Sequence, residues 1–144
     1  MTRKNMDLPE DLQARRVEIL NRRLADAIDL QLQSRQAYWN IKGPHFLSLR
    51  ELFDRIVEDV EKYANQIAER IVQVGGKAEG TARAVARRSS LSRPLLASAD
   101  YSEALLKMLT DFGRHIRYAS AQAIELRDVD TAEIFTGIAR GIEK

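Results

Sequence analysis

The sequence contains no cysteine, which excludes disulfide bonds, thiolate chemistry and cysteine-based zinc sites. It also lacks any uninterrupted apolar run near the roughly 18 residues that a membrane-spanning helix needs, so no membrane partner is expected. The first residues, MTRKNMDLPEDLQ, lack the apolar stretch of a secretory signal, and a cytoplasmic location is therefore expected. The net charge is only +2, so composition alone does not predict general affinity for polyanions.

Proline and glycine are scarce, with three and seven residues, and their positions divide the chain into long segments. Within these segments apolar residues recur at three- and four-residue spacing with charged residues between them, which is the pattern of amphipathic helices. The pattern predicts helices at about 12–38, 45–74, 101–126 and from about 131 to the end. Residues 1–10 are expected to form a short N-terminal tail. The second helix should end at Gly75-Gly76, because glycine favours the position after a helix C-terminus.

The lengths of the connections indicate how these four helices are joined. The first link is about six residues and the third about four, so each joins an antiparallel hairpin, whereas residues 75–100 form a link of about 25 residues. A link of this length is needed to return along a helix of roughly 42 Å. Residues 81–87 carry helix-forming residues and should form a short helix within the crossing. The prediction is an all-α fold: one ferritin-like four-helix bundle over residues 1–144, with one long crossover.

Metal-ligating residues distinguish this chain from a bundle that holds two metals in its core. There is no Glu-x-x-His motif, and the two histidines are His45, before the second helix, and His115, within the third. A specific series of motifs is present instead. The segment 36–46 reads QAYWNIKGPHF and is followed by LFD at 52–54, IAER at 67–70, GG at 75–76, GT at 80–81 and DVDTAEI at 128–134. Together these motifs resemble the signature of the Dps family of mini-ferritins, and the resemblance covers nearly the whole chain.

The resemblance implies a hollow dodecamer that binds iron, oxidises it, stores the ferric mineral and protects against oxidative stress. In that family iron is oxidised at two-fold interfaces, with ligands from both subunits. Helix geometry agrees with a shared site, because Asp54 and Glu69 are 15 residues apart, roughly 22 Å along one helix. Two antiparallel copies would place Asp54 of one chain opposite Glu69 of the other and generate two equivalent sites.

The family's five ligand positions are only partly kept. They carry Tyr38 and Arg50 in place of two histidines, Asp54 for an aspartate, Asn65 in place of a second aspartate, and Glu69 for the glutamate. Iron favours imidazole and several carboxylates, so this ligand set predicts a depleted oxidation site and leaves ferroxidase activity open. One alternative is an interfacial salt-bridge network of Arg50, Asp54 and Glu69. The other is an altered metal site that recruits Glu58 or Glu61.

Two further surfaces follow from the resemblance. Asp128, Asp130 and Glu133 fall where the family has its three-fold pore, and an acidic ring there would attract cations. The alternative is helix capping, with Asp130 at the cap and Glu133 three residues on.

DNA binding is a weaker expectation than iron binding. The basic candidates are Arg3, Lys4, Arg83, Arg87, Arg88 and Arg93. Repeated in a cage they could contact phosphates, although such runs also serve as solvated faces or salt-bridge partners between subunits. The alternative function is therefore a non-catalytic structural cage or a nucleoid-associated DNA-binding protein.

Overall fold

The computed structural model describes residues 2–42, 46–91 and 101–143, with side-chain surroundings for 10–42, 47–91 and 103–143. Five α-helices and no strand occur in these ranges. The helices are α1 (Thr2–Asn40), α2 (Phe46–Gln73), α3 (Ala82–Arg88), α4 (Tyr101–Glu125) and α5 (Val129–Ile142). The all-α prediction is confirmed, and the short crossover helix predicted over 81–87 is present one residue further along as α3.

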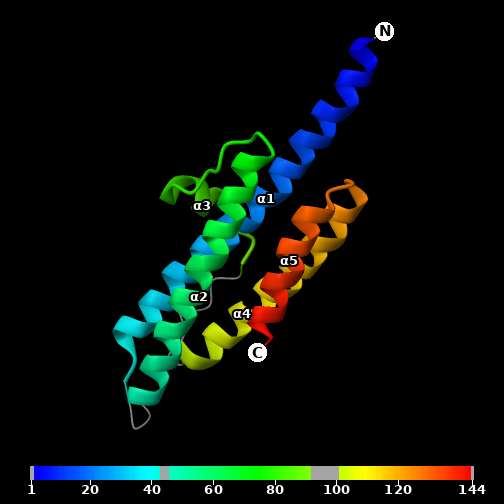
Figure 1. Cartoon of the computed structure of the whole chain (residues 1–144). Coiled ribbons are helices and arrows are strands. Elements are labelled where there is room, and N and C mark those ends of the chain that lie inside the picture. The colour runs from blue at the N-terminus through cyan, green and yellow to red at the C-terminus, as the bar shows by residue number, and fades with distance from the viewer. Residues whose placement is uncertain (1, 43–45, 92–100, 144) are drawn as a thin grey trace.

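The four long helices form two hairpins (Figure 1). Helices α1 and α2 pack against each other, as do α4 and α5, while α1 also contacts α4 and carries α3 on its side. The segment between α2 and α4 crosses from one hairpin to the other, as its length predicted. None of the helices in the described ranges combines the length and the apolar character needed to cross a membrane.

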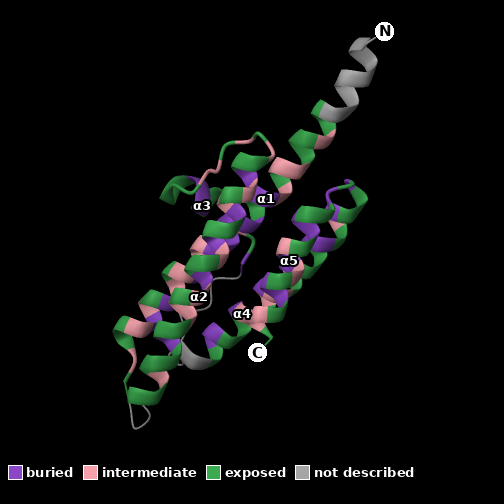
Figure 2. Ribbon diagram, in the orientation of Figure 1, coloured by how far each residue is buried: buried purple, intermediate pink, exposed green. Residues whose placement is uncertain are grey.

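Buried residues lie on the helix faces that face one another and exposed residues on the outer faces (Figure 2), and most of the buried residues are apolar. The largest fully buried side chains are Phe53, Phe112, Phe135, Leu20, Leu30, Ile67, Ile71, Leu105, Met108, Ile116 and Ile138. They come from α1, α2, α4 and α5, which makes one continuous core. Full burial of each such side chain is worth about 1.5–3 kcal/mol, so the core rather than helix propensity holds the bundle together.

The ends of α2 and α4 use the same backbone turn with different residues. After α2, Gly75 adopts φ +88° and the Gly76 N–H donates to the carbonyl of Ile71 at 2.8 Å, as the Gly-Gly pair predicted. After α4, the left-handed position is occupied by Arg127, with φ 60°. The Asp128 N–H then closes the turn on the carbonyl of Ala123 at 2.9 Å. The second turn therefore places a side chain where glycine is favoured.

Two helix starts differ from the sequence-based expectation. Helix α1 begins at Thr2 rather than near Leu12, so the predicted N-terminal tail continues the helix and projects beyond the other helices in Figure 1. The helix runs through Pro9, although a proline inside a helix removes one hydrogen bond and crowds the preceding turn. Helix α5 begins at Val129 and is capped by Asp128, whereas the sequence suggested a cap at Asp130.

A buried amide fixes the start of the crossover to α1. The Asn21 side chain is 1% exposed, donates to the carbonyl of Lys77 at 3.0 Å and accepts from the N–H of Glu79 at 3.0 Å. Both hydrogen-bonding functions of one side chain are thus used on the same short stretch of irregular backbone. Such backbone groups need partners when they are buried, so Asn21 sets the path of the chain as it leaves α2.

A buried carboxylate fixes the chain after α3. Asp26 is fully buried and accepts hydrogen bonds from the Ser90 backbone N–H at 2.7 Å and from the Ser90 hydroxyl at 3.1 and 3.0 Å. The Nδ1 atom of His115, on α4, lies 3.4 Å from Asp26 and 3.1 Å from the Ser90 hydroxyl. Asp26 therefore ties together α1, the crossover and α4.

Candidate functional site

The end of α1 and the first half of α2 enclose a cavity of about 280 Å³. Its lining residues are Arg35, Tyr38, Trp39, Asp54, Val57, Glu58 and Glu61. Asp54, Glu58 and Glu61 stand at i, i+4 and i+7 on α2, so their side chains share one helix face. The structure thus brings together four residues predicted from the sequence: Tyr38, Asp54, Glu58 and Glu61.

The two residues that replace histidine contact each other across the hairpin. The guanidinium carbon of Arg50 lies 4.6 Å from the centre of the Tyr38 ring, which is a cation–π distance. The Tyr38 ring therefore stabilises the positive charge of Arg50, which stands at a position where a metal site would have a neutral imidazole. The interfacial salt-bridge network of Arg50, Asp54 and Glu69 stays a prediction.

Arg35 is a cavity residue that the sequence analysis did not identify. It precedes Tyr38 by three positions on α1, so the two side chains lie on the same side of the helix. That spacing was the available signal. Arg35 adds positive charge beside three carboxylates. It therefore offsets part of the negative charge that would attract a cation into this cavity.

Asn65 and Glu69 lie further along α2, are exposed, and do not line the cavity. Within the described residues of one chain, no group of three or more His, Asp or Glu side chains is arranged to hold a metal ion. The surface around the cavity is apolar for an exposed region, since Trp39 is 70%, Leu47 71% and Leu52 43% exposed. Large exposed apolar side chains at one end of a hairpin are typical of a contact with another protein surface.

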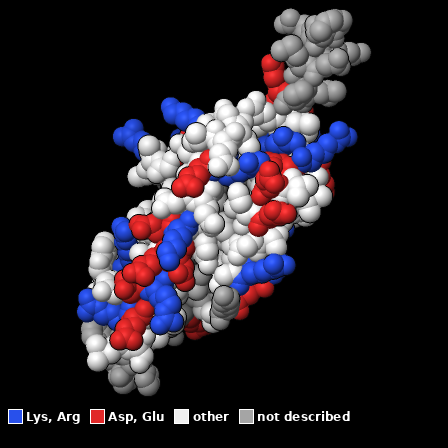
Figure 3. Space-filling model, viewed as in Figure 1, with Lys and Arg blue, Asp and Glu red and all other residues white. Residues whose placement is uncertain are grey.

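Charges of both signs gather on the face that carries this end of the hairpin (Figure 3). Lys and Arg side chains are interleaved there with Asp and Glu, so this face has no region of a single sign. Such a mixed surface suits paired contacts with a second copy better than it suits a polyanion.

Known proteins share both the sequence and the fold. The sequence profile of the ferritin-like domain matches residues 17–144. A DNA protection during starvation protein of Agrobacterium fabrum is 36% identical over 141 residues, which cover 96% of this chain and 87% of the relative. The chain belongs to the Dps family. Among solved structures, DpsA14 from Streptomyces coelicolor has a TM-score of 0.84 at 30% identity, covering 92% of this chain and 80% of that one. A Dps protein from Bacillus brevis has the same fold, with a TM-score of 0.86 at 24% identity and coverage of 92% and 91%.

The start of α5, where the Dps resemblance predicts a pore, contains acidic residues in two different environments. Asp128 is 4% exposed and caps the helix, accepting from the Thr131 N–H at 3.2 Å and the Thr131 hydroxyl at 2.5 Å. Arg70 on α2 donates to the same carboxylate at 2.8 Å and to the Thr131 hydroxyl at 2.9 Å. Asp130 and Glu133 are exposed.

The environment of Asp128 explains its acidity. Burial by itself would raise the pKa of this carboxyl, but the hydrogen bonds from Thr131 and the ion pair with Arg70 outweigh burial and lower the pKa below its ordinary value of 3.8. Asp128 is therefore a charged structural cap with its oxygens already engaged. This corrects the sequence-based grouping of three equivalent pore acids: only Asp130 and Glu133 present free surface.

The basic residues that the Dps resemblance suggested for DNA are also not equivalent. Arg83 and Arg87 are exposed on α3. Arg88 is half-buried and lies 3.5 Å from Glu79 and 4.0 Å from Glu18, so it links α3 to the crossover and to α1. Arg93 lies outside the described residues, and the side chains of Arg3 and Lys4 lie outside the described ones as well.

Proposed function

We propose that this chain assembles into a closed dodecameric Dps cage in the cytoplasm that takes up Fe(II) as its substrate, oxidises it slowly and stores the ferric product. The observation that carries the proposal is the cavity of Asp54, Glu58 and Glu61 at an exposed, partly apolar end of the α1–α2 hairpin. Three carboxylates on one helix face offer the oxygen ligands that iron accepts, and the apolar surface around them offers an area for subunit contact.

The site is completed by a second subunit in this proposal. Asp54 and Glu69 are too far apart on α2 to bind one ion, at roughly 22 Å by helix geometry. A two-fold axis between antiparallel copies of α2 brings Asp54 of one chain toward Glu69 of the other, twice per dimer. Glu58 and Glu61 lie between these positions and supply the further carboxylates.

Oxidation at such a site is expected to be slow. Each Fe(II) gives up one electron, so two Fe(II) reduce one peroxide molecule to two water molecules with uptake of two protons. The growing positive charge on iron is best offset by anionic ligands, whereas Asn65 contributes none and Arg35 and Arg50 add cations nearby. The depleted ligand set thus weakens iron binding and slows iron oxidation.

Asp130 and Glu133 provide the route for iron in this proposal. They are exposed in the first turns of α5, at the position where the family places its three-fold pore. Repeated by symmetry they form an acidic ring that concentrates Fe(II), and its effect should weaken as ionic strength rises.

Two measurements test the proposal. Native mass measurement should give about twelve times 16.4 kDa, and a stable monomer at micromolar concentration would refute the cage. Crystals soaked anaerobically with Fe(II) should show anomalous density between Asp54 and the Glu69 of a neighbouring subunit. Density confined to crystal contacts, or none at this interface, would refute the shared iron site while leaving the cage intact.

A second candidate function is a non-catalytic cage that binds DNA and associates with the nucleoid. The observation that favours it is the pair of exposed arginines on α3, Arg83 and Arg87, which a cage would repeat many times. An electrophoretic mobility assay should then show binding that weakens steeply with salt and is lost when both arginines are replaced by glutamine. Equal binding by this double variant would exclude α3 as the DNA surface.

A further inference from the structure

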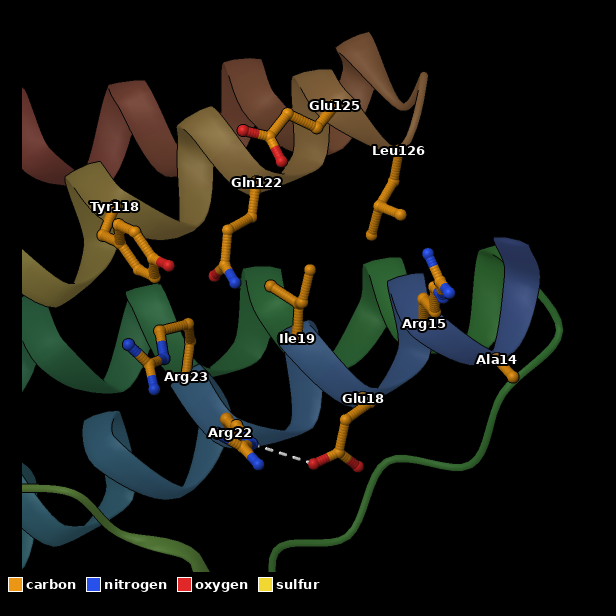
Figure 4. A pocket seen from close by; sticks show the side chains of 10 residues that line it. All are labelled: Ala14, Arg15, Glu18, Ile19, Arg22, Arg23, Tyr118, Gln122, Glu125 and Leu126. Carbon is orange, nitrogen blue, oxygen red and sulfur yellow. Dashed lines mark hydrogen bonds and ion pairs between the residues drawn. The ribbon is translucent and has the colours of Figure 1, made fainter. Parts of the chain in front are cut away.

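A second, larger cavity lies between α1 and the last turns of α4. Its volume is about 560 Å³. Figure 4 shows Tyr118 and Arg23 together at one end and Leu126 and Arg15 at the other, with Ile19 between them. The combination of apolar side chains with a few polar groups is typical of a small-molecule site of this size.

All three arginines that line this cavity have an acidic residue within 3.4 Å, but two of them form these pairs at the exposed surface. Arg22 pairs with Glu18 at 2.9 Å, and Arg15 lies 3.4 Å from Asp11. Both pairs are solvent-exposed and stand one turn apart on α1, which is ordinary helix-surface pairing. These two arginines therefore do not call for a ligand.

Arg23 is different because it is buried and poorly hydrogen-bonded. It is 8% exposed, and its one hydrogen bond among the described residues runs to the carbonyl of His115 at 3.4 Å. Its Nε lies 3.4 Å from Asp26 but makes no hydrogen bond. The Asp26 oxygens are already used by the backbone and hydroxyl of Ser90, which explains why Asp26 does not draw Arg23 closer.

Among the nitrogens of this guanidinium, Nε is buried without a hydrogen-bond partner. Arg carries five N–H donors in a planar fork, and burying them without acceptors is unfavourable. Burial lowers the pKa of Arg23 despite the neighbouring Asp26, with Arg22 adding to the decrease. An anion reaching the cavity would supply further acceptors and a second negative charge beside that of Asp26.

We propose that this cavity binds a small organic monocarboxylate with a compact apolar body. The carboxylate would accept from the Arg23 guanidinium and the Tyr118 hydroxyl, with the Gln122 amide within the same cavity wall. The apolar body of the ligand would pack against Ile19 and Leu126. A planar carboxylate matches the arginine fork, and Glu18 and Glu125 in the same lining disfavour ligands with more than one negative charge.

The probes are 3-phenylpropanoate and its neutral amide, titrated by calorimetry into the assembled full-length protein. The acid should bind saturably at one site per chain, and the amide about tenfold more weakly or worse, because it cannot provide a charge-assisted hydrogen bond. Equal binding of acid and amide, or no saturable binding of the acid at millimolar concentration, would overturn the proposal.

Variants then locate the site. Arg23→Met should reduce the affinity for 3-phenylpropanoate at least tenfold, whereas Arg83→Met, the same change on an exposed arginine of α3, should leave it unaltered. Arg23 is buried, so its replacement could also disturb folding. A second variant, Tyr118→Ala, changes a side chain that is 65% exposed, and this variant should fold normally. It should weaken binding several-fold, and unaltered affinity in Tyr118→Ala would place the bound acid elsewhere and refute the site.

Discussion

Asp128 and Asp130 are two residues apart, yet the structure predicts opposite consequences of removing them. In Asp128→Ala, the α5 cap is lost and the guanidinium of Arg70, 16% exposed at its side chain, loses its charged partner. Breaking a buried ion pair costs about 3–5 kcal/mol and losing an N-cap about 1 kcal/mol. Arg70 keeps its hydrogen bonds to Thr131 and Gln73, so we expect a combined loss near the lower limit of this sum, about 4 kcal/mol. The exposed Asp130→Ala should lose at most about 1 kcal/mol.

The assay is thermal or denaturant unfolding at one fixed protomer concentration, because assembly contributes to apparent stability. Hydrogen exchange gives a local measure: the Thr131 amide, which donates to Asp128, should lose protection in Asp128→Ala and keep it in Asp130→Ala. Adding Arg70→Met to Asp128→Ala removes the unpaired charge. The loss of unfolding free energy in the double variant should therefore be smaller than the sum of the losses in the two single variants, by about 2 kcal/mol.

Acid provides an independent check on the same carboxylate. The pKa of Asp128 is lowered in the folded protein, so the stability it contributes is complete above the unfolded value near 3.8 and decreases as pH falls toward the folded pKa. The stability difference between wild type and Asp128→Ala should therefore be constant near neutral pH and narrow below about pH 4. A destabilisation equal to that of Asp130→Ala, or a difference that does not narrow in acid, would refute the role assigned to Asp128.

Three other predictions follow from the iron sites and the helix ends. Asp130→Asn combined with Glu133→Gln should slow Fe(II) uptake several-fold at low ionic strength and much less at high ionic strength, while uptake unchanged in both conditions would exclude an electrostatic role. Iron oxidation should be faster in the triple variant Tyr38→His, Arg50→His and Asn65→Asp, and slower in Glu69→Ala. The measurement is the growth of ferric absorbance after peroxide is added to protein loaded anaerobically with Fe(II). Rapid oxidation by the wild-type protein would contradict the interpretation of a depleted site. Arg127→Gly should raise stability by about 1 kcal/mol because it relieves a left-handed residue, and a loss of stability would show that the Arg127 side chain outweighs its backbone cost.

The parts of the fold that the sequence predicted rest on local signals. The Gly75-Gly76 pair ended α2 where expected, because glycine is favoured at the left-handed position that closes this turn. The length of the 75–100 segment predicted the crossover, since a link of about 25 residues is far longer than an antiparallel hairpin needs and long enough to return along a helix of this size. At the cavity, the spacing of Asp54, Glu58 and Glu61 placed all three on one face of α2.

The parts that the sequence did not predict depend on residues distant in the chain or on an unusual backbone. The end of α4 carries no glycine signal, because Arg127 takes the left-handed position, so the cap of α5 was assigned two residues too late. The environment of Asp128 also depends on Arg70, which is 58 residues away in sequence. Similarly, nothing in the local pattern around Asp26 indicates that its partner is Ser90, because a buried polar position on a helix does not specify which residue satisfies it.

The contacts of Asp26 also constrain the order in which the chain folds. Its hydrogen-bond partners lie 64 residues ahead in the crossover, and His115 lies 89 residues ahead on α4. The α1–α2 hairpin forms from neighbouring residues, but on its own it offers this carboxylate Arg23, three residues earlier on α1, and neither Ser90 nor His115. Loop closure costs only about 0.6 kcal/mol more for each doubling of loop length, so docking of α4 adds little entropy cost once the crossover is in place. Asp26 therefore favours cooperative joining of the two hairpins, because its contacts to Ser90 and His115 form only when the crossover and α4 have packed against α1.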